Sequence, residues 1–430
     1  MKILIKNGKV IDPAQKIFKQ MDILVDNGKI EKVEKNISAR SVEIIDAEGK
    51  LVTPGFIDMH THLREPGDEN KETVESGLRA AIKGGFTTVC AMPNTKPACD
   101  NAQQARYLFE RAREIGTASV LPIGAMTKDR KGKEMSEMGD LKDAGVLAVS
   151  DDGDSVQDAL LMRRVLEYAS MLDLLAISHC EDKSLSEGGV MNEGKWSTVL
   201  GLLPIPGASE SIIVDRDIRL SEIAGARIHI AHVSTRESVE IIRRAKKKGI
   251  HVTCEATPHH MTLTDESLGS YDTNLKVNPP LRSDDDVAAI KKGLKDGTID
   301  VIATDHAPHL ISEKEKEFDY APFGMIGLET ALALAAEALV EGGHLDWPGL
   351  IEKLTSNPAG ILKISSGTLA PGSVADITVI DPEKEWVYEE NKIVSLSRNS
   401  PFKMRKMKAM VTDVIAGGKI VLRDGELVEK

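Results

Sequence analysis

The sequence has few cysteines, few aromatic side chains and no long uninterrupted hydrophobic run. Its four cysteines are scattered and form no Cys-x-x-Cys pair, which predicts a reducing compartment and no disulfide framework. No apolar run approaches the ~20 residues that a membrane-spanning helix needs, and the first residues lack the apolar core of a signal peptide. These absences predict a cytoplasmic protein without a membrane partner.

An excess of positive charge is also missing. The 430 residues include 67 acidic and 55 basic side chains, which gives a formal net charge of −12. A general nucleic-acid binder needs clustered lysine and arginine, so the composition argues against nucleic acid as a partner. A small anionic substrate fits this charge balance only where positive charge is concentrated locally.

Eight apolar runs, each followed by a helix-like segment, dominate the middle of the chain. This alternation predicts parallel strands with right-handed crossovers, and eight such units close into a (β/α)8 TIM barrel. Both chain ends instead show short apolar stretches and turn signals at Asn7-Gly8, Asn27-Gly28 and Gly417-Gly418, which predict one small β-sandwich domain. We therefore predict an α/β protein with a barrel at 51–365 and a β domain from 1–50 and 366–430. The predicted barrel strands are 51–57, 87–92, 119–123, 146–149, 174–177, 227–231, 251–254 and 300–303.

The first predicted barrel strand runs into His60, His62 and Arg64. Residues two apart on an extended chain point to the same side, so both imidazoles converge on one point and suit a metal such as zinc. Arg64 continues the same alternation and would place a charged fork for a carboxylate beside that metal. An isolated His-x-His is as often a pair of loop histidines, so the other strands decide between the two interpretations.

Further metal-ligand residue types follow the other predicted strands, at the carboxyl ends where barrel active sites are built. The predicted ligands of two Zn²⁺ ions are His60, His62, Asp152, His179, His232 and Asp305. Asp152 would bridge the ions together with a hydroxide. Asp151 is the alternative, because strand alternation lets only one of the pair face inward, and Gly153 mildly favours Asp152.

The predicted chemistry follows from these ligands. Metal-bound water ionises near neutral pH, so the bridging hydroxide would serve as the nucleophile. Asp305 can act as general base towards the attacking water and then return the proton to a leaving nitrogen as general acid. The predicted reaction is metal-assisted hydrolysis of an amide-like bond.

Several motifs carry a resemblance to a known family. They are the segments 58–67, 92–95, 151–153, 305–309, 321–324 and 372–376. In these segments and nearly end to end, the chain resembles the bacterial type of dihydroorotase, in the metal-dependent amidohydrolase superfamily. The resemblance implies reversible cyclisation of N-carbamoyl-L-aspartate to L-dihydroorotate in pyrimidine (UMP) biosynthesis. It also implies a homodimer and allows an association with aspartate transcarbamoylase.

The resemblance further implies a set of substrate contacts. These are His62, Arg64, Asn94, Asn278, His309, Phe323 and Gly324. Arg64, Asn94 and His309 would hold the substrate carboxylate, and Asn278 with the backbone around Phe323 and Gly324 would contact the ring. The segment 310–322 is expected to form a lid or a wall of the pocket.

Two alternative functions stay open. Hydantoinases and allantoinases act on related cyclic amides, but those families usually carry a bridging lysine and lack an arginine in the first motif. The end of the fourth predicted strand has no lysine. A non-catalytic, dihydroorotase-like scaffold for aspartate transcarbamoylase is the alternative from another class, and such a protein is expected to have lost ligands that are present here.

Overall fold

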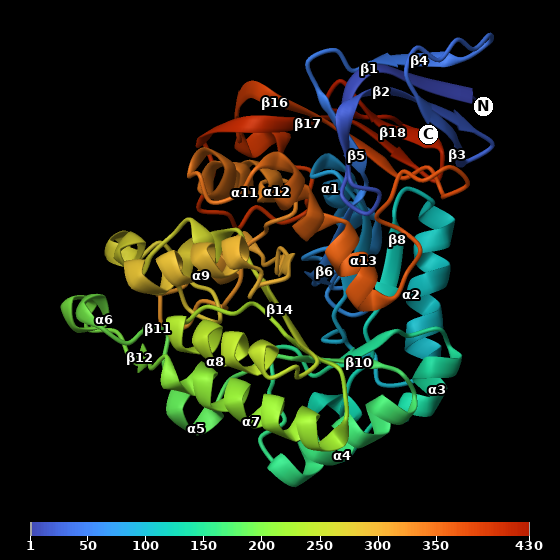
Figure 1. Cartoon of the computed structure of the whole chain (residues 1–430). Coiled ribbons are helices and arrows are strands. Elements are labelled where there is room, and N and C mark those ends of the chain that lie inside the picture. The colour runs from blue at the N-terminus through green and yellow to red at the C-terminus, as the bar shows by residue number, and fades with distance from the viewer. Residues whose placement is uncertain (1, 430) are drawn as a thin grey trace.

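Eight short parallel strands form the predicted barrel in the computed structural model, which describes residues 2–429 (Figure 1). The barrel strands are β6 (Phe56–Thr61), β7 (Phe86–Ala91), β8 (Ser119–Pro122), β9 (Ala148–Ser150), β10 (Leu175–Ser178), β13 (Ile228–Ile230), β14 (Val252–Ala256) and β15 (Val301–Ile302). Two hydrogen-bonded ladders hold them, one from β6 to β8 and the other from β9 to β15. Isolated bridges from Gly124 to Val149 and from Thr61 to His306 join the ladders, so the barrel is closed.

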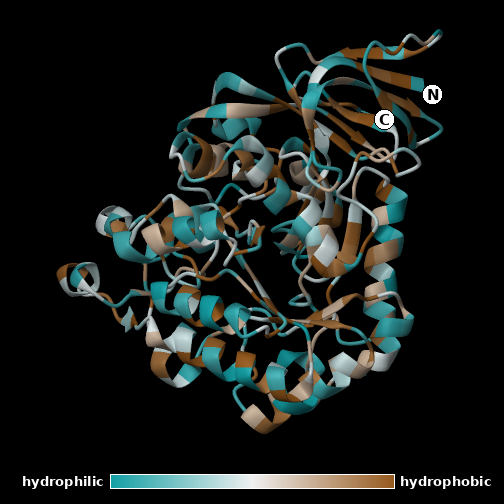
Figure 2. Cartoon of the chain, in the orientation of Figure 1, coloured by the Kyte–Doolittle hydropathy of each residue, from teal (hydrophilic) through white to brown (hydrophobic). Residues whose placement is uncertain are grey.

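Amphipathic helices surround these strands. The longer ones are α1 (Val74–Lys83), α2 (Ala102–Ile115), α3 (Met138–Asp143), α4 (Ala159–Met171), α7 (Ala208–Ala224), α8 (Arg236–Lys247), α9 (Asp284–Asp296), α12 (Trp347–Leu354) and α13 (Ser356–Leu362). In α8, buried Val239, Ile242 and Ala245 recur at helical spacing on one face, and the Thr235 side chain caps the first turn. In Figure 2 the strands are mostly hydrophobic, whereas the helices carry both hydrophobic and hydrophilic residues. Among residues 2–429, every helix is too short or too polar for a bilayer span.

Short elements occupy the longer loops between barrel units. They are α5 (Lys183–Ser186), β11 (Met191–Asn192), α6 (Lys195–Leu200) and β12 (Pro204–Ile205), and, after β15, α10 (Ile311–Lys314) and α11 (Ala331–Ala335). The first four lie between β10 and β13, and α6 extends outward at the left of Figure 1. Buried Arg282 holds β11 and β12 in place, because its guanidinium donates to Asn192 Oδ1 at 2.9 Å and to the Ile205 carbonyl at 3.2 Å.

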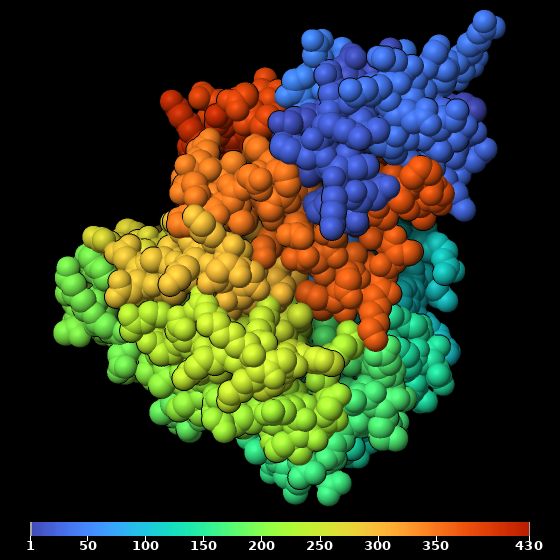
Figure 3. Space-filling model, viewed as in Figure 1, coloured from blue at the N-terminus to red at the C-terminus, as the bar shows by residue number. Residues whose placement is uncertain are grey.

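Both chain ends contribute strands to one sheet, which builds the small β-sandwich domain. Its strands are β1 (Lys2–Asp12), β2 (Ile17–Asp26), β3 (Lys29–Glu34), β4 (Glu43–Asp46), β5 (Leu51–Pro54), β16 (Ile377–Val387), β17 (Lys406–Ala416), β18 (Lys419–Arg423) and β19 (Glu426–Leu427). The order is β19-β18-β17-β16-β5-β1-β2-β3, with β4 on β1. The link is β5, which pairs in parallel with β1 and antiparallel with β16. The first and last parts of the chain therefore lie side by side, as the blue and red surfaces in Figure 3 show.

Asn7 and Gly8 form a bulge inside β1, and the hairpin turn predicted there is wrong. The pairing register with β2 shifts at this point, and Asn7 has a φ of 63°. The Asn7 backbone N–H donates to the Asp22 carboxylate at 2.9 Å, which supports the bulge and lets the strand continue. Asn27-Gly28, with φ values of 48° and 79°, is the predicted turn between β2 and β3.

The run 51–57, predicted as one barrel strand, is two strands in different sheets. Gly55 separates β5 from β6, and its N–H donates to the Asp376 carbonyl at 2.9 Å. A Cβ on Gly55 would lie 2.2 Å from Thr87 Oγ1, so only glycine fits this crossing. Both strands are buried throughout, which is why their apolar pattern runs on without a break. The division at residues 50 and 366 stays a prediction.

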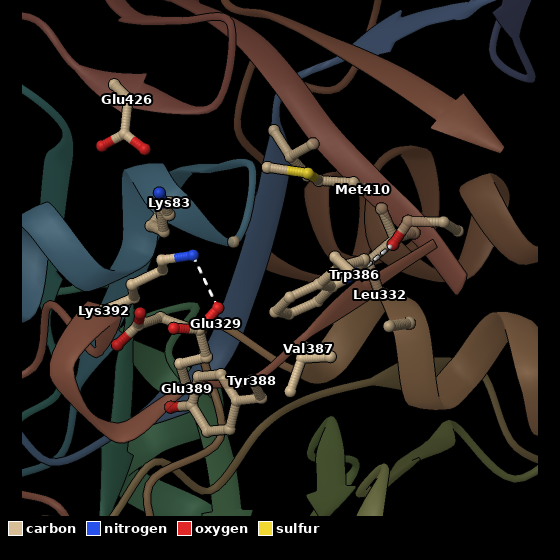
Figure 4. A pocket seen from close by; sticks show the side chains of 14 residues that line it. Lys83, Glu329, Leu332, Trp386, Val387, Tyr388, Glu389, Lys392, Met410 and Glu426 are labelled. Carbon is tan, nitrogen blue, oxygen red and sulfur yellow. Dashed lines mark hydrogen bonds and ion pairs between the residues drawn. The ribbon is translucent and has the colours of Figure 1, made fainter. Parts of the chain in front are cut away.

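A cavity of about 280 Å³ lies where β16 and β17 meet α1 and α11 (Figure 4). Leu332 and Trp386 contribute apolar walls, and the Glu329 carboxylate lies at its edge. Glu329 accepts hydrogen bonds from the backbone N–H groups of Val394 and Ser395, both at 3.0 Å. Burial outweighs these hydrogen bonds and raises the pKa of Glu329 to about 7.

We predict that Glu329→Gln stabilises the protein at pH 8 and not at pH 5. A carboxyl with a raised folded pKa keeps a proton that the unfolded chain loses, so stability falls as pH rises from about 4.5 to about 7. Glutamine cannot ionise, and its side-chain oxygen can still accept from both backbone N–H groups. Allowing for the partial exposure of Glu329, we expect a gain of about 1 kcal/mol at pH 8.

Thermal unfolding at pH 5 and pH 8 measures this effect. The control is Glu389→Gln at the rim of the same cavity, where the carboxylate pairs with Lys392 at 2.7 Å. This second variant should not be stabilised at pH 8. An equal unfolding temperature for Glu329→Gln and the unaltered chain at pH 8 would show that the cavity does not penalise the ionised carboxylate.

Candidate metal centre

The six side chains predicted as metal ligands meet at the carboxyl ends of the barrel strands. They come from the last residues of β6 or from residues shortly after β6, β9, β10, β13 and β15. All six are buried, with exposed fractions between 0% and 7%. Parallel barrel strands end on one face, which is how positions as far apart in sequence as 60 and 305 come together.

Asp152 lies among the four histidines. Its Oδ1 is 3.1 Å from His60 Nε2 and 3.5 Å from His232 Nε2. The same oxygen is 3.7 Å from His179 Nδ1, and Asp152 Oδ2 is 3.5 Å from His62 Nε2. One carboxylate therefore lies near predicted ligands from three other strands.

The choice between Asp151 and Asp152 follows from their hydrogen bonds. The Asp151 carboxylate accepts from the backbone N–H of Met126 at 2.8 Å and of Thr127 at 3.0 Å, and from the Thr127 hydroxyl. Asp151 thus holds the loop that follows β8. Of the two aspartates, only Asp152 faces the histidines.

Asp305 also lies against the His60–His62 pair. Its Oδ1 is 3.0 Å from His62 Nε2 and 3.5 Å from His60 Nε2. Asp305 and His232 have φ values of 50° and 30°, in a region that non-glycine residues rarely adopt. Such residues cost about 1–3 kcal/mol each and cluster at functional sites. At both positions the departure from strand geometry directs a ligand side chain towards the centre.

These donors fit a divalent metal ion. His60 Nε2 and Asp152 Oδ1 are buried and have no hydrogen-bond partner among residues 2–429. Two groups have ligand atoms within 4.8 Å of one another, namely His60 with Asp152 and His232, and His60 with His62 and Asp305. His179 Nδ1 and His232 Nε2 lie 2.9 Å apart, so a proton or a cation must separate their lone pairs. Imidazole and carboxylate are donors that suit zinc.

The charge of the centre also favours a cation. Burial alone would raise the pKa values of Asp152 and Asp305, but the surrounding histidines outweigh burial and hold both below the usual range. Burial lowers the pKa of His62, whereas at His60 burial is outweighed by Asp152 and Glu255, which raise its pKa. Both aspartates are therefore ionised at neutral pH, and positive charge between them is stabilised.

Arg64 lies beside the centre, although it does not continue the strand alternation as predicted. The strand β6 ends at Thr61, and Arg64 has a φ of 58°. Its Nε donates to the Pro308 carbonyl at 3.1 Å, and its Nη2 donates to His309 Nε2 at 3.3 Å. Burial and the charge of Arg64 lower the pKa of His309 to about 2, so this imidazole is neutral and can accept. The structure thus brings Arg64 and His309 together.

The remaining predicted contacts surround the same region. Asn94 Oδ1 accepts from His62 Nδ1 at 2.8 Å, which leaves His62 Nε2 for the centre. Asn278 Nδ2 donates to Glu181 Oε2 at 3.1 Å. Asn278 and Phe323 line an open pocket of about 810 Å³ beside the ligands.

Two buried lysines hold the segment 310–322 and the residues that follow it. Lys314 Nζ donates to the Gly324 carbonyl at 2.9 Å, and Lys276 Nζ donates to the Phe318 carbonyl at 2.6 Å. Lys276 also lies 4.7 Å from the centre of the Phe323 ring. Of the two roles predicted for this segment, these contacts favour a wall over a lid.

Carboxylates behind the ligands are missing from the sequence-based set. Glu181 Oε2 accepts from His179 Nε2 at 3.1 Å, and Glu255 Oε1 accepts from His60 Nδ1 at 2.7 Å. Both glutamates lie at or after a strand end, and this position is the only feature of the sequence that points to them. That position alone does not reveal which histidine a carboxylate will meet.

Comparison with known proteins agrees with this geometry. A family model described as dihydro-orotase-like matches residues 49–238. The dihydroorotase of Elusimicrobium minutum is 53% identical over 430 residues and covers 100% of both chains. That of Pelotomaculum thermopropionicum is 52% identical over 424 residues and covers 99% of each. Among solved structures, the L-hydantoinase of Arthrobacter aurescens has a TM-score of 0.88 at 24% identity over 100% of this chain and 97% of its own. It shares the fold, which confirms the predicted barrel and β-sandwich.

Proposed function

This chain belongs to the dihydroorotase family, and on that premise we propose that its centre catalyses the reversible cyclisation of N-carbamoyl-L-aspartate to L-dihydroorotate. The reaction belongs to pyrimidine biosynthesis. Its reverse is the hydrolysis of a cyclic amide, which is the reaction class predicted from the residues. The observation that carries the proposal is a full-length relationship at 53% identity together with six ligand-type side chains that meet beside Arg64.

We propose Zn²⁺ as the metal, with two ions per chain and Asp152 between them. The residues that would hold the ions are His60, His62, Asp152, His179, His232 and Asp305. A bound ion of this kind polarises a carbonyl group and lowers the pKa of water towards neutrality.

We assign proton transfer to Asp305. Its carboxylate is ionised at neutral pH and lies at the centre, 3.0 Å from His62 Nε2. In ring opening, the oxygen of water adds to the ring carbonyl carbon, and Asp305 takes the proton that this water loses. Asp305 then gives the proton to the ring nitrogen as the C–N bond breaks. In ring closure it takes the proton from the carbamoyl nitrogen and returns it to the departing water.

Arg64, Asn94 and His309 are proposed to bind the carboxylate of the substrate ring. Arg64 keeps donors that neither the Pro308 carbonyl nor His309 uses, and a guanidinium matches a carboxylate in two-point contact. Asn278, Phe323 and Gly324 would contact the ring itself. Hydantoin and allantoin rings bear no carboxylate, so the half-buried Arg64 would have no carboxylate partner in a site built for them. Arg64 therefore favours dihydroorotate over those substrates.

Three finer expectations rest only on the composition, for the location, or on the family resemblance, for the partners. They are a cytoplasmic location, a homodimer and an association with aspartate transcarbamoylase, and each stays a prediction. The scaffold alternative is disfavoured, because all six ligand residues are present and face one another.

Metal removal tests the proposed function. We expect hydrolysis of dihydroorotate to stop after dialysis against a chelator and to return when zinc is added back. Elemental analysis of the active protein should find about two zinc ions per chain. Hydantoin and allantoin, assayed beside dihydroorotate, should be poor substrates. Full activity without bound metal, or a preference for hydantoin, would contradict the proposal.

A further inference from the structure

We propose that Glu255 is a positioning residue that orients His60 and His232 for metal binding. The inference rests on the proposed metal site, but it concerns a side chain outside the ligand set. Glu255 lies within β14, and its side chain is fully buried, with an exposed fraction of 0%. A buried carboxylate is costly unless its oxygens are hydrogen-bonded, so its partners indicate its role.

Both Glu255 oxygens accept hydrogen bonds from residues of other barrel strands or just after them. Oε1 is 2.7 Å from His60 Nδ1 and 3.3 Å from the backbone N–H of His232. Oε2 is 3.1 Å from His229 Nε2. One side chain of β14 therefore contacts a ligand on β6 and the backbone of a second ligand after β13. Glu255 therefore fixes His60 and His232 relative to each other.

The contact with Glu255 determines the tautomer of His60. An imidazole that binds a metal ion carries one ring proton, and the carboxylate can only accept. Nδ1 therefore keeps the proton, and Nε2 keeps the lone pair. Nε2 is the atom that lies 3.1 Å from Asp152 Oδ1 and has no hydrogen-bond partner. Glu255 thus presents His60 in the form that a metal ion requires.

His229 completes this arrangement. Its Nδ1 lies 2.8 Å from Thr253 Oγ1, which can donate its hydroxyl proton. Nε2 then carries the ring proton and donates it to Glu255. The row from Thr253 through His229 and Glu255 to His60 has one donor for each acceptor.

Zinc binding by the full chain tests this role. Glu255→Gln keeps the shape and one acceptor oxygen but removes the charge, and the opposite tautomer of His229 can accept from the new amide. We expect the zinc dissociation constant, measured by competition with a chromogenic chelator, to rise about 10- to 100-fold. Equal zinc affinity in Glu255→Gln and the unaltered chain overturns the proposal. Zinc affinity is read without substrate, so failure of the proposed reaction would be a separate result.

Asp22→Asn is the matched control for the loss of a buried carboxylate. Asp22 lies on β2 in the other domain and accepts from the backbone N–H groups of Asn7 and Ile37, both at 2.9 Å. It should leave zinc affinity unchanged even where it lowers stability. A similar loss of zinc affinity in both variants would trace the effect to stability and overturn the positioning role.

The tautomer of His60 provides a second measurement on the unaltered sequence. In the zinc-loaded full chain with ¹⁵N-labelled histidine, the His60 signals can be assigned by their absence in His60→Gln. The ring proton should be found on Nδ1. A proton on Nε2 would overturn the proposal even if Glu255→Gln failed to fold.

Discussion

Asp305→Ala is expected to lower kcat for dihydroorotate hydrolysis about 1000-fold, within the range for general acid–base groups. The substitution removes the carboxylate that is 3.0 Å from His62 Nε2 and leaves Asp152 enclosed by histidines, so no equivalent proton acceptor remains. KM should change less than kcat, because Asp305 acts on the reacting atoms and does not hold the ring carboxylate. Steady-state kinetics with zinc in the assay measures both constants.

Asp300→Asn is the matched control, because Asp300 precedes β15 and Asp305 follows it. Asp300 accepts from the Cys254 N–H at 2.9 Å and from Lys246 Nζ at 2.6 Å, at the opposite end of the barrel. This variant should lose some stability and keep its kcat. The metal content of Asp305→Ala shows whether the variant has lost only the proton acceptor or also a bound ion. Retention of the full rate would remove Asp305 from the mechanism.

The barrel follows from the sequence because its strands leave a strong local pattern. Strands buried on both faces are apolar runs, and each is followed by a helix whose buried residues recur on one face, as in α8. The point where the chain changes sheet leaves no such pattern. It depends on Gly55 passing Thr87 of a neighbouring strand. The bulge at Asn7 likewise depends on Asp22, which the local sequence does not identify as its partner.

The candidate site, like the barrel, is predictable in part. Ligand types after successive strands point to one centre because parallel strands end together. The residues behind them depend on how neighbouring strands are staggered, so the pairing of Glu255 with His60 emerges only in three dimensions. Arg64 illustrates the intermediate case. It lies beside the centre, as predicted, but a turn with a φ of 58° brings it there and not the strand alternation.

Arg64→Met is expected to lower kcat/KM for dihydroorotate about 100-fold or more, mainly through KM. Loss of one partner of a buried, hydrogen-bonded charge pair costs about 2–5 kcal/mol, and each 1.4 kcal/mol is about tenfold. The substitution also removes the donor to His309, so the carboxylate contacts loosen together. Initial rates over a range of dihydroorotate concentrations give both constants.

Two comparisons decide whether this loss comes from the carboxylate. Dihydrouracil is the same ring without the carboxylate, so its slow hydrolysis should be nearly equal in Arg64→Met and the unaltered chain. Arg111→Met is the control for loss of a nearby guanidinium, because Arg111 pairs with Glu65 at 3.3 Å on the outside of the site. It should leave both substrates unaffected. Equal losses on dihydroorotate and dihydrouracil would mean that Arg64 shapes the pocket as a whole and that another group holds the carboxylate.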